Sequence, residues 1–213
     1  MTRYNITTGN RWHNIGGNRI HHTAIINWDQ LDIGTGNEIG PYVCIGTDAQ
    51  HRSEVSVGKI VIGNDNIIRE YCTLHLPTRH SKITAIGSNC YLMVQSNIAH
   101  DCVVEDNVTF SNNATLGGHV HIMRNAQIGY NVSIHQFQVI GSYCMIGMGT
   151  VIPRKKRILP GTKWVGNPAR LIGKNEVGLK RAGISEKDLA IELEYYEKIQ
   201  KGVYDKQDDE EDE

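Results

Sequence analysis

Between Ile98 and Phe137 the chain carries its densest set of polar and titratable side chains. Asp101 follows His100 directly, and Gly118 and Gln136 come 18 and 36 residues after His100. An imidazole is the side chain best suited to remove a proton from an alcohol near neutral pH. A neighbouring carboxylate can fix its tautomer, and a glycine N–H can donate to a developing oxyanion. The set therefore suits acyl transfer to a hydroxyl or an amine, provided that the fold brings these groups together.

A six-residue repeat predicts the elements that position these groups. Every sixth residue from Ile86 to Ile152 is apolar, which chance produces in about one chain in 10⁵ at 39% apolar residues. The anchors are Ile86, Leu92, Ile98, Val104, Phe110, Leu116, Ile122, Ile128, Ile134, Ile140, Ile146 and Ile152. The same frame reaches back to Ile20 with interruptions.

A second set of inward positions lies two residues before each anchor, and nearly all of its members are small. Alternating large and small side chains is what a narrow core requires. We therefore predict that Cys72, Cys90, Cys102 and Cys144 are core residues rather than redox or metal groups. The five cysteines include no CxxC pair, so neither a disulfide framework nor a zinc ribbon is predicted.

These hexads resemble the hexapeptide-repeat proteins, whose fold is a left-handed parallel β-helix with three hexads in each coil. The predicted fold class is therefore an all-β solenoid of about seven coils, with a short C-terminal α-helical appendage. In such a fold, residues 18 apart stack, so His100, Gly118 and Gln136 form one column. Asp101, His119 and His135 flank it. The resemblance also implies a homotrimer with sites between subunits.

Two other interpretations of the histidines remain open from the residues alone. They could be ordinary polar groups on the surface of a solenoid. Three of them could also bind a metal ion, as in hexapeptide-repeat carbonic anhydrases. The ligand spacing of that family is not found here, so we predict no metal site.

The rest of the chain divides by composition. We predict a β-helix domain over residues 1–160, with an N-terminal cap at 1–19 and loops near 47–61 and 77–82, where a rigid solenoid carries specificity. Residues 161–203 form a C-terminal loop and helical segment, in which a capping box at 185–188 begins an amphipathic helix that ends near Gly202. Residues 204–213 are rich in acidic side chains and are predicted to be disordered.

Charge and hydropathy exclude several classes of protein. The net charge of −1 gives no support for nucleic-acid binding. No stretch approaches the roughly 18 consecutive apolar residues of a membrane span, and the N-terminus lacks the apolar core of a signal peptide. We therefore predict a soluble, cytoplasmic protein without an integral membrane segment.

Four motifs carry a more specific resemblance. They are Ile98-Ala99-His100-Asp101-Cys102, Asn112-Asn113-Ala114-Thr115-Leu116-Gly117-Gly118-His119, His135-Gln136-Phe137 and Gly178-Leu179-Lys180-Arg181. Over about residues 20–190 the chain resembles the UDP-N-acetylglucosamine 3-O-acyltransferases, which begin lipid A assembly. The resemblance implies transfer of a 3-hydroxyacyl chain from an acyl carrier protein to the 3-position of a UDP-N-acetylglucosamine-type sugar nucleotide. It implies no bound cofactor, because the donor is the phosphopantetheine thioester of the carrier.

The same resemblance assigns roles to residues. His100 is the general base, Asp101 its partner, and the Gly118 N–H the oxyanion donor. The substrate-binding positions are Gln50, Asn97, His119, His135, Gln136, Asn175 and Arg181. Met148 occupies the place of the acyl-length ruler, where a bulky side chain resembles the members that use shorter chains, because a filled groove rejects extra methylenes.

The chain also departs from the pattern of this family. Asn97 stands where the family has a substrate-binding histidine, and Gln50 lacks the Lys and Asp that normally follow it. The C-terminal part is shorter, and Gly166-Asn167-Pro168-Ala169 resembles the acetyl-CoA-dependent members. Two alternatives follow: an acetyl-CoA-dependent sugar O- or N-acetyltransferase, and a catalytically inactive trimeric module that binds sugar nucleotides.

Overall fold

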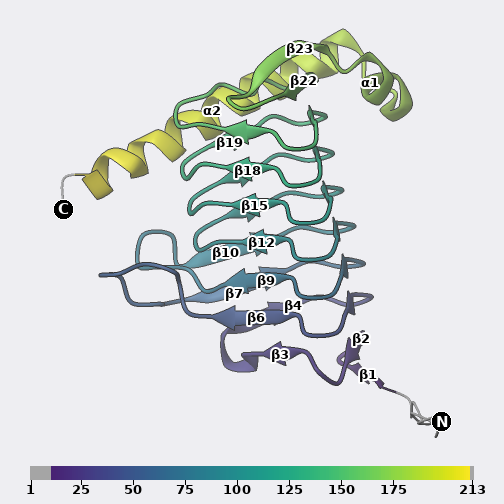
Figure 1. Ribbon diagram of the computed structural model, residues 1–213, viewed down its shortest axis with the longest axis vertical. Coiled ribbons are helices and arrows are strands. Elements are labelled where there is room, and N and C mark those ends of the chain that lie inside the picture. Colours follow the sequence, from purple (N-terminus) through teal and green to yellow (C-terminus); the bar gives the residue numbers. More distant parts are fainter. Residues whose placement is uncertain (1–10, 212–213) are drawn as a thin grey trace, which may run out of the picture.

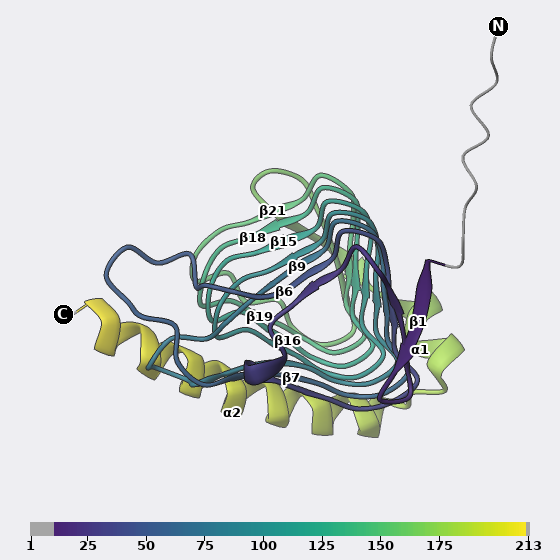
Figure 2. The same ribbon diagram turned by 90° about the horizontal axis from the view of Figure 1, so that it is seen from below.

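Three sheets of mostly parallel strands wrap around a triangular core in the computed structural model, which describes residues 11–211 and their side chains up to residue 203 (Figure 1, Figure 2). The fold is a left-handed parallel β-helix, as predicted. An antiparallel hairpin closes its N-terminal end, and two α-helices lie at its C-terminal end. Within these residues, no helix has both the length and the apolar character needed to cross a membrane.

Each face of the prism is one sheet, in which neighbouring strands pair in the following order. The ten-stranded sheet contains β1 (Trp12–Ile15), β2 (Asn18–His21), β5 (Glu38–Ile39), β8 (Ile67–Ile68), β11 (Tyr91–Leu92), β14 (Thr109–Phe110), β17 (Gln127–Ile128), β20 (Met145–Ile146), β22 (Thr162–Val165) and β23 (Arg170–Lys174). The seven-stranded sheet contains β21 (Val151–Ile152), β18 (Ser133–Ile134), β15 (Thr115–Leu116), β12 (Asn97–Ile98), β9 (Thr73–His75), β6 (Cys44–Thr47) and β3 (Ile25–Ile26). The six-stranded sheet contains β19 (Val139–Ile140), β16 (His121–Ile122), β13 (Val103–Val104), β10 (Ile83–Ile86), β7 (Lys59–Ile62) and β4 (Leu31–Ile33), which a short 3-10 turn at Trp28–Gln30 precedes.

Strand register shows where the coils are regular and where they are interrupted. Tyr91 pairs with Thr109, a spacing of 18 residues that holds along the regular coils. Lys59 pairs with Ile83, so 24 − 18 = 6 residues are inserted in the loop between β9 and β10. Leu31 pairs with Ile60, so 29 − 18 = 11 are inserted between β6 and β7.

The two loops are the predicted interruptions with corrected limits. The predicted loop at 47–61 spans only 48–58, because Lys59–Ile62 pairs with strands on both sides. The predicted loop at 77–82 begins one residue earlier, at residue 76. Both loops leave the prism at the corner between the seven-stranded and six-stranded sheets, and the first projects furthest (Figure 2).

The core matches the two inward positions of the hexad. All twelve anchors from Ile86 to Ile152 are buried, and so are all twelve side chains two residues before them. Burial raises the pKa of Cys72 and of Cys102 to about 12, so both thiols stay protonated. The prediction that these cysteines fill the core is confirmed.

Two helices cover the C-terminal end. Asn175 caps α1 (Glu176–Ala182) by accepting from the Gly178 N–H at 3.2 Å. The predicted capping box is present at the start of α2 (Glu186–Glu211), where the Asp188 N–H donates to Ser185 Oγ at 3.2 Å and the Ser185 N–H donates to Asp188 at 2.9 Å. Tyr196 then packs against Met123 and Val139.

The helix α2 runs further than predicted. It continues through Gly202 to Glu211, so residues 204–211 are helical rather than disordered. A single glycine costs a helix only about 1 kcal/mol, and no proline follows it. Residues 212–213 of the predicted tail and 1–10 of the predicted cap lie outside the described residues.

Candidate active site

The residues of the predicted column meet at one corner of the prism. His100 and Asp101 lie in the turn between β12 and β13, where the seven-stranded sheet gives way to the six-stranded sheet. Gly118 lies in the turn one coil further on, between β15 and β16. Gln136 lies in the next, between β18 and β19. The 18-residue spacing therefore stacks them as predicted.

His100 and Asp101 form a buried hydrogen-bonded pair. Nδ1 of His100 lies 2.8 Å from Oδ2 of Asp101, and the Asp101 side chain has no exposed surface. Burial alone would raise the pKa of Asp101, but hydrogen bonds from His100, Ser81 and Thr78 outweigh it and hold that pKa well below its usual range. The ionised carboxylate accepts from Nδ1–H, which leaves the Nε2 lone pair of His100 for a substrate proton.

Gly118 lies directly against the imidazole of His100. A Cβ at this position would fall 2.4 Å from Cε1 and 2.7 Å from Nε2 of His100, so only glycine lets the ring occupy its place. The Gly118 N–H has no acceptor within residues 11–211. A donor held beside the base in this way can serve an oxyanion.

A second column, one residue further along each turn, supports the first. Asp101, His119 and Phe137 all adopt left-handed backbone angles, with φ of 61°, 60° and 57°. The His119 ring stacks on Phe137 at 4.5 Å, and its Nε2 lies 3.5 Å from the Asp101 carboxylate. The role of Phe137 was not predicted. Its signal is that the same turn position elsewhere is often asparagine, which tolerates this conformation better than phenylalanine.

The two loops bring further imidazoles to this corner. His51, from the 48–58 loop, lies edge-on to His100 with 5.8 Å between ring centroids. His80, from the 76–82 loop, lies 6.2 Å from the ring of His119. Glu54 joins the loops, because its carboxylate is 3.1 Å from Arg79 Nε and 3.9 Å from His80 Nε2. Sequence reasoning missed the contacts of both histidines, although the breaks in the hexad frame marked the loops.

Asn97 lies beside an imidazole that was also missed. Its Oδ1 is 3.1 Å from Nε2 of His75, a buried residue on the preceding coil. The same oxygen accepts from the Thr73 hydroxyl at 2.7 Å. The histidine that the resemblance implies at position 97 is absent, but an imidazole lies next to the amide that stands there.

The other predicted substrate residues near this corner are open to solvent. Gln50 is exposed in the 48–58 loop, next to His51. His135 and Gln136 are exposed on the coil beyond Gly118, and Nδ1 of His135 lies 3.1 Å from the Gln136 carbonyl oxygen. All three are accessible to a ligand that approaches His100 from outside the prism.

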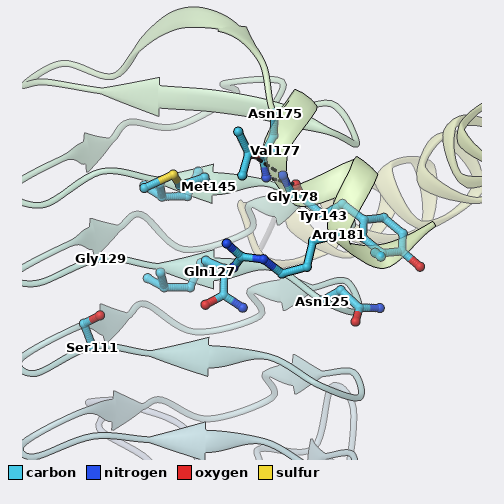
Figure 3. A pocket seen from close by; sticks show the side chains of 13 residues that line it. Ser111, Asn125, Gln127, Gly129, Tyr143, Met145, Asn175, Val177, Gly178 and Arg181 are labelled. Atoms are coloured by element: carbon cyan, nitrogen blue, oxygen red, sulfur yellow. Dashed lines mark hydrogen bonds between the residues drawn. The ribbon is translucent and has the colours of Figure 1, made fainter. Parts of the chain in front are cut away.

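Asn175 and Arg181 lie elsewhere, in a groove of about 570 Å³ between α1 and the outer face of the ten-stranded sheet. Figure 3 shows Arg181 extending from α1 towards Gln127. The Asn175 side chain donates to the Tyr143 carbonyl at 2.8 Å and accepts from Gly178, so it fixes α1 as well as lining the groove. The groove is lined by the guanidinium of Arg181, by side-chain amides such as that of Gln127, and by apolar side chains.

One chain therefore does not bring all the predicted site residues together. The His100 corner joins the seven-stranded and six-stranded sheets, whereas the groove of Arg181 lies over the ten-stranded sheet on the opposite side (Figure 2). Met148 is 75% exposed at a third place, the turn from the ten-stranded to the seven-stranded sheet. The three places therefore lie on different sides of one chain.

His100, Asp101 and His119 also form a compact donor group. One ligand atom from each lies within 4.8 Å of the others, a spacing that a metal ion could bridge. The carboxylate of Asp101 already accepts hydrogen bonds from His100 and from the 76–82 loop. Both oxygens of this carboxylate therefore already accept hydrogen bonds, and the sequence-based prediction of no metal stays a prediction.

Comparisons with known proteins agree with the fold and the motifs. The family model of the bacterial transferase hexapeptide (six repeats) matches residues 84–118. Acyl-(acyl-carrier-protein)–UDP-N-acetylglucosamine O-acyltransferases from Gloeothece citriformis and a Synechocystis strain are 38% and 39% identical over 160 residues, which is 75% of this chain. The chain spans only 57% of the length of these two relatives.

A solved structure gives fuller coverage. The crystal structure of a UDP-N-acetylglucosamine acyltransferase from Bacteroides fragilis superposes with a TM-score of 0.75 and 32% identity. The match covers 84% of this chain and 70% of that one.

Proposed function

Since this chain belongs to the UDP-N-acetylglucosamine acyltransferase family, we propose that it transfers a 3-hydroxyacyl chain from an acyl carrier protein to the 3-position of a UDP-N-acetylglucosamine-type sugar nucleotide. The observation that carries the proposal is the buried His100–Asp101 pair packed on the backbone of Gly118. The names of the curated relatives support the donor and the acceptor. We also propose that the protein is cytoplasmic, as predicted from the sequence.

The geometry supports a direct transfer. His100 Nε2 removes the proton of the acceptor hydroxyl as its oxygen attacks the thioester carbonyl. The resulting oxyanion accepts a hydrogen bond from the Gly118 N–H. When the intermediate collapses, the C–S bond breaks, and the leaving thiolate of the carrier takes the proton from His100. No covalent enzyme intermediate forms, and the base returns to its starting state.

We further propose that the active unit is a homotrimer with a site between neighbours. In this arrangement the His100 corner of one subunit faces the Arg181 groove of the next, and Met148 borders the acyl chain. The separation of these residues within one chain supports the arrangement, because a cyclic trimer repeats one heterologous contact three times. His119, His135, Gln136, Asn97 and Gln50 then contact the sugar nucleotide beside His100.

Mixing two inactive variants tests the shared site. His100→Ala and Arg181→Ala should each lose most activity alone. Random trimers from an equal mixture should recover about a quarter of the wild-type sites, because each site needs His100 from one chain and Arg181 from its neighbour. The measurement is turnover after co-refolding, with size-exclusion light scattering to verify the trimer. A site formed within one chain would give no recovery.

Met148 should set the length of the acyl chain. Met148→Ala removes a bulky side chain, so we expect the preferred chain to lengthen by about two carbons, with a change in preference of about 10-fold or more. Competition between acyl carrier thioesters of different lengths measures this. Ile25→Ala, an exposed apolar side chain on β3 at the N-terminal end of the prism, is the matched control. An unchanged preference in Met148→Ala would remove the ruler role.

Mass spectrometry of sugar nucleotides incubated with acyl donors tests the reaction itself. We expect a 3-O-acyl product from UDP-N-acetylglucosamine and a 3-hydroxyacyl carrier thioester. Product from acetyl-CoA alone would instead support the acetyltransferase alternative. Binding of the nucleotide without turnover under any donor would support an inactive module.

A further inference from the structure

The carboxylate of Asp101 accepts hydrogen bonds from the 76–82 loop, which is an insertion into the regular repeat. We propose that Thr78 and Ser81, both in the 76–82 loop, are positioning residues that hold Asp101, and through it His100, in the geometry of the general base. The catalytic part of this inference rests on the proposed function.

The contacts cover both oxygens of the carboxylate. Thr78 donates its N–H to Oδ1 at 3.0 Å and to Oδ2 at 3.2 Å, and its hydroxyl donates to Oδ2 at 2.7 Å. The Ser81 hydroxyl donates to Oδ1. Together with His100 Nδ1–H on Oδ2, these donors fix the plane of the carboxylate as well as its position.

The position of the 76–82 loop explains why it can bind the Asp101 carboxylate. The six extra residues fall between β9 and β10, in the coil that precedes Asp101. Thr78 is 1% exposed, and the neighbouring loop joins it through a bond from the Val57 N–H to the Pro77 carbonyl at 3.0 Å. A regular six-residue turn would close the coil without the inserted residues and without their hydrogen bonds to Asp101. The insertion therefore supplies hydrogen-bond donors to a buried anion, which otherwise costs several kcal/mol to bury.

We call the hydrogen bonds from Thr78 and Ser81 to Asp101 the clamp. The clamp affects the orientation of the carboxylate rather than its charge. The pKa of Asp101 lies well below its usual range, so losing one hydroxyl donor leaves the carboxylate ionised at assay pH. The other titratable or charged groups around the pair are His119, His51, His80, Glu54 and Arg79. A loosened carboxylate lets the His100 ring rotate away from the acceptor and admits the wrong tautomer, and a displacement of about 1 Å can cost about 100-fold in rate.

Steady-state kinetics with conservative rescue tests the clamp. We expect Thr78→Val and Ser81→Ala to lower kcat by about 10-fold and about 3-fold, with little change in KM for the sugar nucleotide. The double variant should lose at least as much as Thr78→Val alone, without a simple product of the two losses, because both hydroxyls bind one carboxylate. Thr78→Ser should restore kcat to within about 2-fold. Lys82→Asn, in the same loop but exposed, is the control and should behave as wild type. A raised KM with unchanged kcat, or an equal loss in Lys82→Asn, overturns the proposal.

A second measurement separates this inference from the proposed function. The ¹⁵N shifts of the His100 ring, recorded without substrate, should report a single Nδ1–H tautomer in wild type and a mixture in the double variant. If wild type turns over no acyl donor, the proposed function fails, and the ring shifts still decide whether the clamp exists. Identical ring shifts in both proteins would overturn the clamp alone.

Discussion

His100→Ala should lower kcat/KM for acyl transfer by about 10³-fold, the middle of the range for losing a general base. Because Nδ1 of His100 is bonded to Asp101, the lone pair of Nε2 remains for the proton of the acceptor hydroxyl. Without it, the acceptor hydroxyl must lose its proton to water. The Gly118 N–H and the binding contacts remain in the variant, so a residual rate above the uncatalysed reaction should persist.

Single-turnover assays with an acyl carrier thioester and UDP-N-acetylglucosamine measure this loss directly, because they separate chemistry from product release. His13→Ala is the matched control, since His13 is exposed on β1 at the N-terminal end of the prism. It should retain wild-type turnover. Near-wild-type chemistry in His100→Ala would falsify the proposed mechanism, provided that the variant keeps its fold and assembly.

The six-residue repeat was sufficient to predict the core and the column of His100, Gly118 and Gln136, because both follow from the same period of inward-facing residues. Each anchor and each small residue before it is buried where the frame places it. The 18-residue coil then puts Gly118 beside His100 without any knowledge of long-range contacts. Local periodicity is enough here because every coil repeats the pairing of the coil before it.

The contacts that the two loops make escaped prediction because they are not periodic. His51 and His80 reach the site only after 11 and 6 inserted residues fold back onto the corner, and no spacing in the sequence encodes that path. The hydrogen bond from Thr78 to Asp101 was not predicted, for the same reason. Resemblance also grouped Arg181 with His100, although the ten-stranded sheet separates them within one chain.

Gly118→Ala should lower kcat by about 100-fold although it adds a single methyl group. The new Cβ would lie 2.4 Å from Cε1 of His100, closer than such atoms approach, so the ring must move. Backbone strain does not contribute, because Gly118 has no left-handed φ. Overpacking a buried site costs about 1–3 kcal/mol of stability, so thermal unfolding should show a modest loss while chemistry shows a large one.

A matched glycine and a double variant decide how Gly118 acts. Gly202→Ala, where an added Cβ meets no atom within 4 Å, should leave turnover unchanged. If the methyl group acts by displacing the base, Gly118→Ala combined with His100→Ala should fall no lower than His100→Ala alone, since both remove the same function. Additive losses would instead mean that the methyl group disturbs the oxyanion donor or the acyl chain. Either result separates the role of the glycine backbone from that of the imidazole it accommodates.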